Sequence, residues 1–430
     1  MFRFVVWLRE RTTRFWIAPA LSVGVGVALC LLAWGADAVV PADAVPDVSA
    51  ASLNDLLSII ATSMLAVATF SLGVLVSAFA SVSSTATPRA TELVMGDDGT
   101  RRAISAFVGS FVFSIVAKTG LSIDQFAAAG IFVLFCATLA VLAYLVLRLV
   151  LWIRTMSTLG RLGDTLGRIE SVTRDELGQH LCDPWLGARR RPDHEPSGTP
   201  ITPTSTGYLT HIDLARLQDV ASGCDGVVHL TVRPGTFVDP TTPIAVIEHT
   251  DTVPDDVTTE VRAAVLIGQQ RTFDQDPRYG FIVLGEVARR ALSPAVNDPG
   301  TAIQVASLAT AILVDELTSD RAPAARTADD VTVPDLDLGE LVIDAFEAIG
   351  RDGAGDLAVA LRLQKLLGTL ARNVPGPIAD TAVAIAERAV QRSQHAMDLD
   401  HDRQVLQQTH TSLFSGAATD SPGSGRTPAS

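Results

Sequence analysis

The longest stretch of this sequence without a charged residue runs from Leu56 to Pro88 and reads LLSIIATSMLAVATFSLGVLVSAFASVSSTATP. A helix rises about 1.5 Å per residue, so a helix of these residues would be longer than the roughly 30 Å thickness of a bilayer's hydrocarbon core. We therefore expect a membrane-spanning helix that tilts or projects beyond the membrane.

Three further apolar runs accompany this stretch. They cover residues 15–36, 103–117 (continuing past Lys118, whose amine can reach the membrane surface) and 125–147. The chain is 48% hydrophobic and only 19% charged, whereas a soluble domain carries about a quarter charged residues. We expect an α-rich membrane protein, with a four-helix transmembrane bundle over residues 1–154 followed by a cytoplasmic α+β domain.

Positive charges on the connections between these runs predict their orientation. They precede the first run, separate the second from the third and follow the fourth, whereas the loop after the first run holds only acidic charges. The positive-inside rule then predicts a multi-pass protein of the cell inner (plasma) membrane with both termini on the cytoplasmic side. The alternative is a cleaved signal peptide ending at Ala36–Ala38, for which the first apolar run is too long. The basic residues are Arg3, Arg9, Arg11, Arg14, Arg89, Arg101, Arg102, Arg148, Arg154 and Arg161.

Small and hydroxyl residues recur along the second run at spacings of three and four, which places them on one face of a helix. In lipid, such a face lets helices approach closely. The two interpretations are a packing seam inside the bundle and the polar lining of a pore in an oligomer. We favour the seam because no acid or base lies mid-span, which also disfavours an ion-coupled transporter. This small-residue face comprises Thr62, Ala66, Thr69, Gly73, Ser77 and Ser81.

The rest of the chain divides into segments of different composition. Apolar periodicity indicates helices, alternation indicates strands, and regions rich in Pro, Gly, Ser and Asp cannot bury a core. In chain order we expect a juxtamembrane amphipathic helix at 155–182, a linker at 183–206, a small α/β or β-barrel-like module at 207–250, a helical domain at 255–410 containing a mobile loop at 319–335, and a disordered tail at 411–430.

Charge and residue spacing argue against several functional classes. The formal net charge of −14 disfavours nucleic acid, because phosphate contacts need a basic face. The four cysteines include no C-x-x-C pair, and His211, His229 and His249 lack the spacing of a metal site. We predict no metal and no cofactor, with the lipid bilayer and further copies of the chain as partners.

Polar residues are unusually dense between residues 268 and 302. Asp276 and Asp298 each precede a proline at the start of an apolar-periodic helix, which predicts two N-caps that need no ligand. If the two helix starts converge near Arg271 and Asn297, their free amides would attract an anionic group. The candidate site for a small anionic ligand comprises Arg271, Thr272, Asp274, Asp276, Ser293, Asn297, Asp298 and Thr301.

Several short motifs in this region form a recognisable pattern. They are Arg271-Thr272, Gln275-Asp276, Ala291-Leu292-Ser293-Pro294, Asn297-Asp298-Pro299 and Thr301-Ala302. With Pro88-Arg89 and the module at 207–247, they make the chain similar to the bacterial predicted membrane protein family known as domain of unknown function 2254. The resemblance implies an integral membrane protein with a cytoplasmic domain, and it implies no particular activity.

Three functional classes remain open. We favour an oligomeric channel-like or sensory membrane protein with a cytoplasmic regulatory domain. The second class is a membrane-tethered enzyme that uses Arg271, Asp274, Asp276 and Asp298. It is less favoured because the sequence has no nucleophile elbow, P-loop, H-E-x-x-H or G-x-G-x-x-G motif. The third class is a membrane scaffold for a protein partner.

Overall fold

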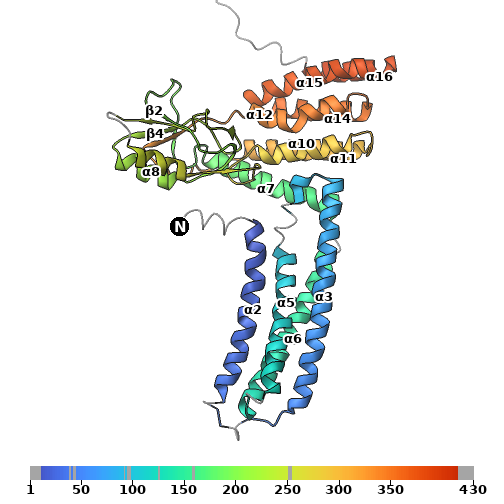
Figure 1. Cartoon of the computed structure of the whole chain (residues 1–430). Coiled ribbons are helices and arrows are strands. Elements are labelled where there is room, and N and C mark those ends of the chain that lie inside the picture. The colour runs from blue at the N-terminus through green and yellow to red at the C-terminus, as the bar shows by residue number, and fades with distance from the viewer. Residues whose placement is uncertain are drawn as a thin grey trace, which may run out of the picture. The chain divides into compact units, whose positions relative to one another are not determined.

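The structure is a computed structural model whose two compact units are residues 1–165 and 166–430. Each unit is described by itself (Figure 1). Of the expected tail at 411–430, the residues from 415 onward lie outside the described residues. The described residues are 11–414 apart from 38–39, 42–44, 92, 94–97, 124–125, 157–159 and 250–253.

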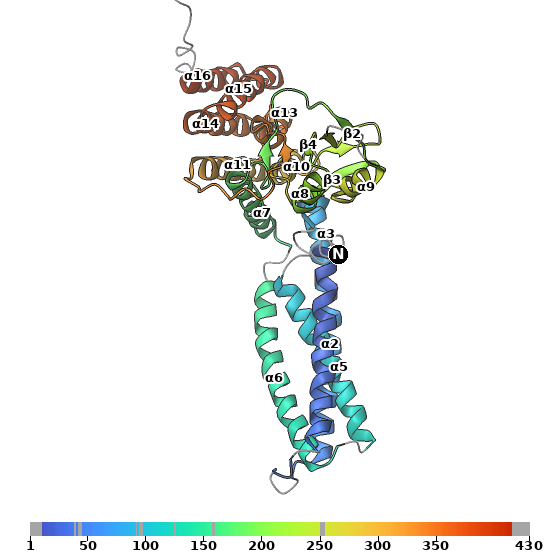
Figure 2. The ribbon, with the colours of Figure 1, turned by 90° about the vertical axis from the view of Figure 1, so that its left-hand side faces the viewer.

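The first unit contains four long apolar helices, as the charge-free runs predict. Helix α5 contacts each of the other three, and α6 also contacts α2 and α3 (Figures 1 and 2). The helices are α2 (Arg11–Ala36), α3 (Ala50–Thr85), α5 (Asp98–Ser122) and α6 (Ala128–Met156), with a short 3-10 helix, η2 (Pro88–Ala90), after α3.

Two local features fix α2 against its neighbours. The Asp37 carboxylate accepts hydrogen bonds from the amides of Ala127 (2.8 Å) and Gly130 (2.6 Å), so it caps the start of α6. Along α2, a Cβ atom on Gly109 of α5 would lie only 2.7 Å from Cβ of Ser22. The absence of a side chain at Gly109 therefore lets α2 and α5 approach closely.

The small-residue face of α3 does not form the expected seam inside the bundle. Its residues from Thr62 to Ser77 are exposed, and only Ser81 is half-buried, donating to the Gly160 carbonyl at 3.1 Å. The Thr62 and Thr69 hydroxyls instead bond to carbonyls of their own helix. Larger apolar side chains occupy the inward face, because they fill the space towards α5: Leu53, Leu57, Ile60, Leu75 and Val82.

The second unit begins at Leu166, within helix α7 (Leu162–Cys182). Two sheets follow this helix. The five-stranded sheet has the order β1-β8-β4-β6-β2, and the three-stranded antiparallel sheet has the order β5-β3-β7. Their elements are β1 (Arg189–Arg190), β2 (Thr199–Ile201), β3 (Gly207–Ile212), α8 (Leu214–Gly223), β4 (Val227–Leu230), β5 (Phe237–Val238), β6 (Ala245–Glu248), α9 (Asp255–Ala263), β7 (Val265–Gly268) and β8 (Val331–Val333).

The larger sheet is mixed. Strand β8 pairs in parallel with β1 and β4, while β6 pairs antiparallel with β4 and β2. Val228 of β4 lies opposite Ile247 of β6, and both are fully buried in one apolar core with residues of α8 and α9. This core holds the α/β part of the unit together.

The helical part of the second unit is layered. Helices α10 and α11 pack together, α14 packs on α11, and α15 and α16 cover α14 (Figures 1 and 2). The helices are α10 (Tyr279–Ala291), α11 (Pro299–Thr318), α12 (Gly339–Val342), the π-helical turn η3 (Ile343–Glu347), α13 (Ala348–Asp352), α14 (Leu357–Asn373), α15 (Pro377–Ala396) and α16 (Asp400–Phe414).

Three expectations about the second unit are corrected. The expected linker at 183–206 contributes β1 and β2 to the sheet, and the expected mobile loop at 319–335 contributes β8, whose three residues are all buried. The helical domain expected from residue 255 begins with α9, which ends at Ala263 and is followed by strand β7. Strands of two to four residues are too short to show a period of two in the sequence.

Four of the described helices are long and apolar enough to cross a membrane by length and composition, namely α3, α5, α6 and α11. Within α2, the stretch Ala20–Ala36 is apolar but shorter than these four. Helix α11 is apolar for another reason, because it lies between α10 and α14 and buries residues such as Val305 and Ile312. No membrane is needed to explain its composition.

Candidate functional site

Arg271 and Asp276 form a closed ion pair. The Arg271 guanidinium donates from Nε and Nη2 to the two carboxylate oxygens, at 2.8 and 2.9 Å, and Asp276 is only 2% exposed. Burial raises the pKa of the Asp276 carboxyl, and Arg271 opposes this rise. Gly235 has φ +91°, and a Cβ there would lie 2.3 Å from the carboxylate, so glycine makes room for the pair. Each member of the pair therefore has its counterion within the same loop.

The residues between Arg271 and Asp276 fasten this loop to β3. The Asp274 carboxylate lies 2.6 Å from Nδ1 of His211. Gln275, with φ +55°, bonds through its side chain to both the amide and the carbonyl of Ile212. Thr272 is half-buried in the same loop. These polar side chains act together as a structural clasp.

Ser293, Asn297, Asp298 and Thr301 lie at the other end of α10. The Asp298 carboxylate accepts from the amide and hydroxyl of Thr301 (3.0 and 2.6 Å), which lowers its pKa and confirms it as the N-cap of α11. Ser293 donates to the Arg290 carbonyl, and Asn297 has φ +49° in a tight turn.

The structure does not bring these two groups together. Helix α10 has 13 residues and separates them by about 20 Å at 1.5 Å per residue. The expected convergence of two helix starts is therefore wrong, because each group lies at a different end of the same helix. The helix also begins three residues after Asp276, with Arg278 at its N-cap, so Asp276 is not a cap. Asp276 accepts from the Arg278 amide at 3.2 Å.

The second unit contains a cavity of about 770 Å³ alongside α7. Its other walls come from the segment before α10, the end of α11 with the residues that follow, and the residues around Leu186 and Arg233. Of the clasp loop, Gln275 borders it, whereas Arg271 and Asp276 do not. The charged and titratable residues in its lining are Arg174, Asp175, Glu176, His180, Cys182, Asp183, Arg233, Glu316 and Arg321.

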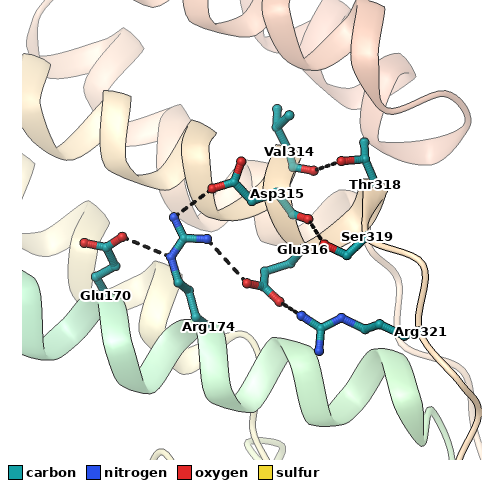
Figure 3. Close-up of polar contacts among 8 residues, drawn as sticks. All are labelled: Glu170, Arg174, Val314, Asp315, Glu316, Thr318, Ser319 and Arg321. Atoms are coloured by element: carbon teal, nitrogen blue, oxygen red, sulfur yellow. Dashed lines mark hydrogen bonds and ion pairs between the residues drawn. The ribbon is translucent and has the colours of Figure 1, made fainter.

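A chain of ion pairs closes one wall of the cavity (Figure 3). Arg174 on α7 bonds to Glu170 (3.0 Å), Asp315 (3.1 Å) and Glu316 (3.4 Å), and Arg321 pairs with the other oxygen of Glu316. Glu316, only 8% exposed, thus joins two arginines and ties the end of α11 to α7. The two cavity-lining arginines in this wall are neutralised by carboxylates.

Glu176 and His180 lie one turn apart on the cavity face of α7. Burial raises the pKa of Glu176 to about 7, with further help from the nearby carboxylates of Asp274, Asp175 and Asp276. Burial also lowers the pKa of His180 to about 4, helped by the positive charge of Arg233. At neutral pH the cavity therefore holds a half-protonated carboxyl group beside a neutral imidazole.

The sequence did not single out these two residues or Arg233. Glu176 and His180 have the i, i+4 spacing of one helix face, which was available as a signal. Nothing in the sequence links that face to Arg233, which lies 53 residues from His180. Folding alone brings them together.

Two of the three histidines considered as metal ligands have separate partners. His211 lies beside Asp274, and His229 bonds to Thr332 and Glu248. Within the described part of the chain, no group of three His, Cys, Asp or Glu residues is placed to hold a metal ion.

Comparisons with known proteins give a family but no activity. No solved structure matches this chain. It is 28% identical over 217 residues to uncharacterized protein Mb1321c of Mycobacterium bovis and to uncharacterized protein Rv1290c of Mycobacterium tuberculosis, covering 47% of this chain and 41% of each relative. The chain thus spans about two fifths of the length of the curated relatives it matches. A family model described as "Predicted membrane protein (DUF2254)" matches residues 12–369, so the chain belongs to this family of predicted membrane proteins.

Proposed function

We propose that this protein is a sensory protein of the bacterial inner membrane. In this proposal the second unit is cytoplasmic and binds a small ligand in the cavity along α7. Ligand binding then changes the conformation of the four apolar helices. Membrane insertion is supported by the large apolar side chains that the first unit exposes, for example Leu32, Phe70 and Val150, which are 66%, 59% and 61% exposed. Such a surface suits lipid far better than water.

The observation that carries the sensing proposal is the position of α7 in the chain. It begins at Leu162, with only five residues between it and the end of α6 at Met156, and its later turns line the cavity. A helix transmits a displacement along its axis because its backbone is hydrogen-bonded throughout. A ligand that moves Glu176 and His180 would therefore act on the chain just after the last apolar helix.

The orientation of the proposed membrane protein follows from its charges. Arg89 and Arg154 lie next to the ends of α3 and α6 that face the same side, whereas Asp37 and Asp55 lie at the opposite ends. By the positive-inside rule, this distribution supports a cytoplasmic second unit and cytoplasmic termini.

We also propose that copies of the chain associate through the small-residue face of α3. The face is exposed within one chain, and a Cβ on Gly73 would meet nothing within 4 Å. Native mass spectrometry in nanodiscs tests this. We expect an oligomer that Gly73→Leu disrupts and that the control Leu72→Phe, on a neighbouring face, leaves intact. A monomeric unmodified protein would contradict the proposal.

The tethered-enzyme alternative draws less support from the geometry. Arg271 and Asp276 bond to each other, Asp274 lies against His211, and Asp298 caps α11. Each side chain has a structural partner that a substrate would first have to displace. Nothing in the described part of the chain singles out a surface for the scaffold alternative.

The sensing proposal is tested by filling the cavity and observing α6. Two single-cysteine chains would keep either Cys182, which lines the cavity, or Cys224, which is similarly half-buried elsewhere in the same unit. Each is alkylated with N-phenylmaleimide in nanodiscs, and amide hydrogen exchange is measured. We expect the Cys182 adduct to change exchange in the last turn of α6 and the Cys224 adduct to leave it unchanged. Equal exchange for both adducts would refute sensing through α7.

A further inference from the structure

Arg233 is a buried arginine held by neutral groups. It is 8% exposed and follows β4. Its Nη1 donates to the carbonyl oxygens of Pro184 (2.9 Å) and Pro334 (2.6 Å), and its Nη2 donates to Nδ1 of His180 (3.3 Å). These three contacts fix the guanidinium at the cavity wall without neutralising its charge.

No carboxylate among the described residues forms an ion pair with Arg233, whereas the cavity-lining Arg174 and Arg321 both pair with Glu316. The acidic residues that act on Arg233 from a greater distance are each engaged elsewhere. Asp335 pairs with Arg190, Asp276 with Arg271, and Asp183 accepts from the Gly187 amide.

A charge in this position is costly without a partner. Burial lowers the pKa of Arg233 to about 10, which shows that the surroundings disfavour its charged form. Arginine can only donate hydrogen bonds, so Nδ1 of His180 accepts and the neutral imidazole carries its hydrogen on Nε2. Arg233 and His180 both line the cavity, so a guanidinium cation and a neutral imidazole lie side by side in its wall.

We propose that the cavity binds a small molecule through one anionic group, a carboxylate or phosphate, held by Arg233 and His180. This inference rests on the proposed sensing function and names the class of ligand. The cavity volume of about 770 Å³ suits a small metabolite. Its other walls carry Asp175, Glu176, Asp183 and Glu316, so a ligand with many negative charges would be repelled. The remainder of the ligand is therefore polar or cationic.

Protection of Cys182 from alkylation tests the proposal in the unmodified full chain. The protein in phosphatidylcholine nanodiscs is treated with iodoacetamide, and peptide mapping follows Cys182, with Cys224 as the internal control. The probes are inorganic phosphate, acetate and succinate, each compared with chloride at equal ionic strength. At a probe concentration about ten times its Kd, we expect Cys182 to react roughly tenfold more slowly and Cys224 to be unaffected. Inorganic triphosphate should protect less.

Two variants assign the effect to Arg233. Arg233→Gln should abolish the protection of Cys182, while the unchanged reactivity of Cys224 shows that the unit remains folded. Arg262→Gln is the matched control, because Arg262 also donates to a carbonyl, that of Thr202, outside the cavity. It should keep the protection. Absence of protection by all the probes, or protection that survives Arg233→Gln, would overturn the inference.

Two further comparisons distinguish the possible sources of the anionic group and separate the anion-binding proposal from the sensing proposal. Protection that arises without an added probe only in nanodiscs containing phosphatidylglycerol would identify a lipid headgroup as the source of the anionic group. Failure of every anion would leave sensing through α7 to be tested by the Cys182 adduct. Conversely, anion protection combined with an adduct that does not affect α6 would support the site and refute its connection to the membrane helices.

Discussion

The loop at 269–278 and the cavity face of α7 are both rich in charged and polar residues, yet their chemistry differs. In the loop, Arg271 and Asp276 neutralise each other. On the cavity wall, Arg233 has only neutral partners, and the pKa values of Glu176 and His180 are strongly shifted. A conspicuous polar motif can therefore be structural. The groups available to a ligand are those that the fold buries without a counterion or with a shifted pKa.

Breaking the closed pair of the loop should have the largest effect on stability. Asp276→Asn leaves the Arg271 guanidinium largely buried without its counterion, so we expect a loss of about 3 kcal/mol of unfolding free energy. The measurement is urea unfolding followed by the fluorescence of Trp185 in the second unit, in a full chain whose other four tryptophans are replaced by Phe.

The control for this prediction replaces both partners. Arg271→Met combined with Asp276→Leu removes both charges together and should recover most of the loss. A loss below about 1 kcal/mol for Asp276→Asn would mean that the pair is not the structural clasp described here.

The shifted pKa values of the cavity wall should instead make the free energy of unfolding depend on pH. The pKa of Glu176 rises from 4.5 unfolded to about 7 folded, so the folded state binds more protons within this window. Stability related to Glu176 is full below pH 4.5 and is lost as the pH rises through 7. Glu176→Gln should therefore be more stable than the unmodified chain above pH 7, by at most about 3 kcal/mol, and equal to it below pH 4.5.

His180 provides the opposite slope in the same unfolding experiment. Its pKa falls from 6.5 unfolded to about 4 folded, so its contribution is full above pH 6.5 and is lost as the pH falls towards 4. His180→Asn should flatten the acid side of the stability profile and leave the alkaline side unchanged. An acid limb as steep as that of the unmodified chain would show that His180 is not buried in its neutral form.

The smallest effect should come from the cap at the far end of α10. Asp298→Ala removes the bonds to Thr301 and should cost about 1 kcal/mol, whereas Asp298→Asn keeps a capping oxygen and should cost only a few tenths. The same Trp185 unfolding curves measure both. Anion protection of Cys182 that changes with Asp298→Asn would contradict the separation of this cap from the cavity.

The sequence predicts the apolar unit well, since a run of uncharged residues long enough to cross a bilayer is a local property. Helices α2, α3, α5 and α6 all follow from it. The cap at Asp298 is local too, because the aspartate and its bonding partner Thr301 lie within one helical turn.

The sheet and the cavity depend on contacts distant in sequence. Strand β8 is found only through its pairing with β1 and β4, and β1 has just two residues. The cavity joins α7 to Arg233 and to the end of α11, so no local pattern reports it. The small-residue face was predicted as a face, but the volume of Leu53, Leu57 and Ile60 decided which side of α3 turns inward.

The most direct test of the central claim compares the same chemical adduct in the two regions. One single-cysteine chain keeps Cys182 in the cavity, and the other carries Thr272→Cys in the clasp loop, outside the cavity lining. Both are alkylated with N-phenylmaleimide in nanodiscs. We predict that the Cys182 adduct alters amide exchange in the last turn of α6 and that the adduct at position 272 does not. An equal response, or a response only to the adduct at position 272, would contradict the account.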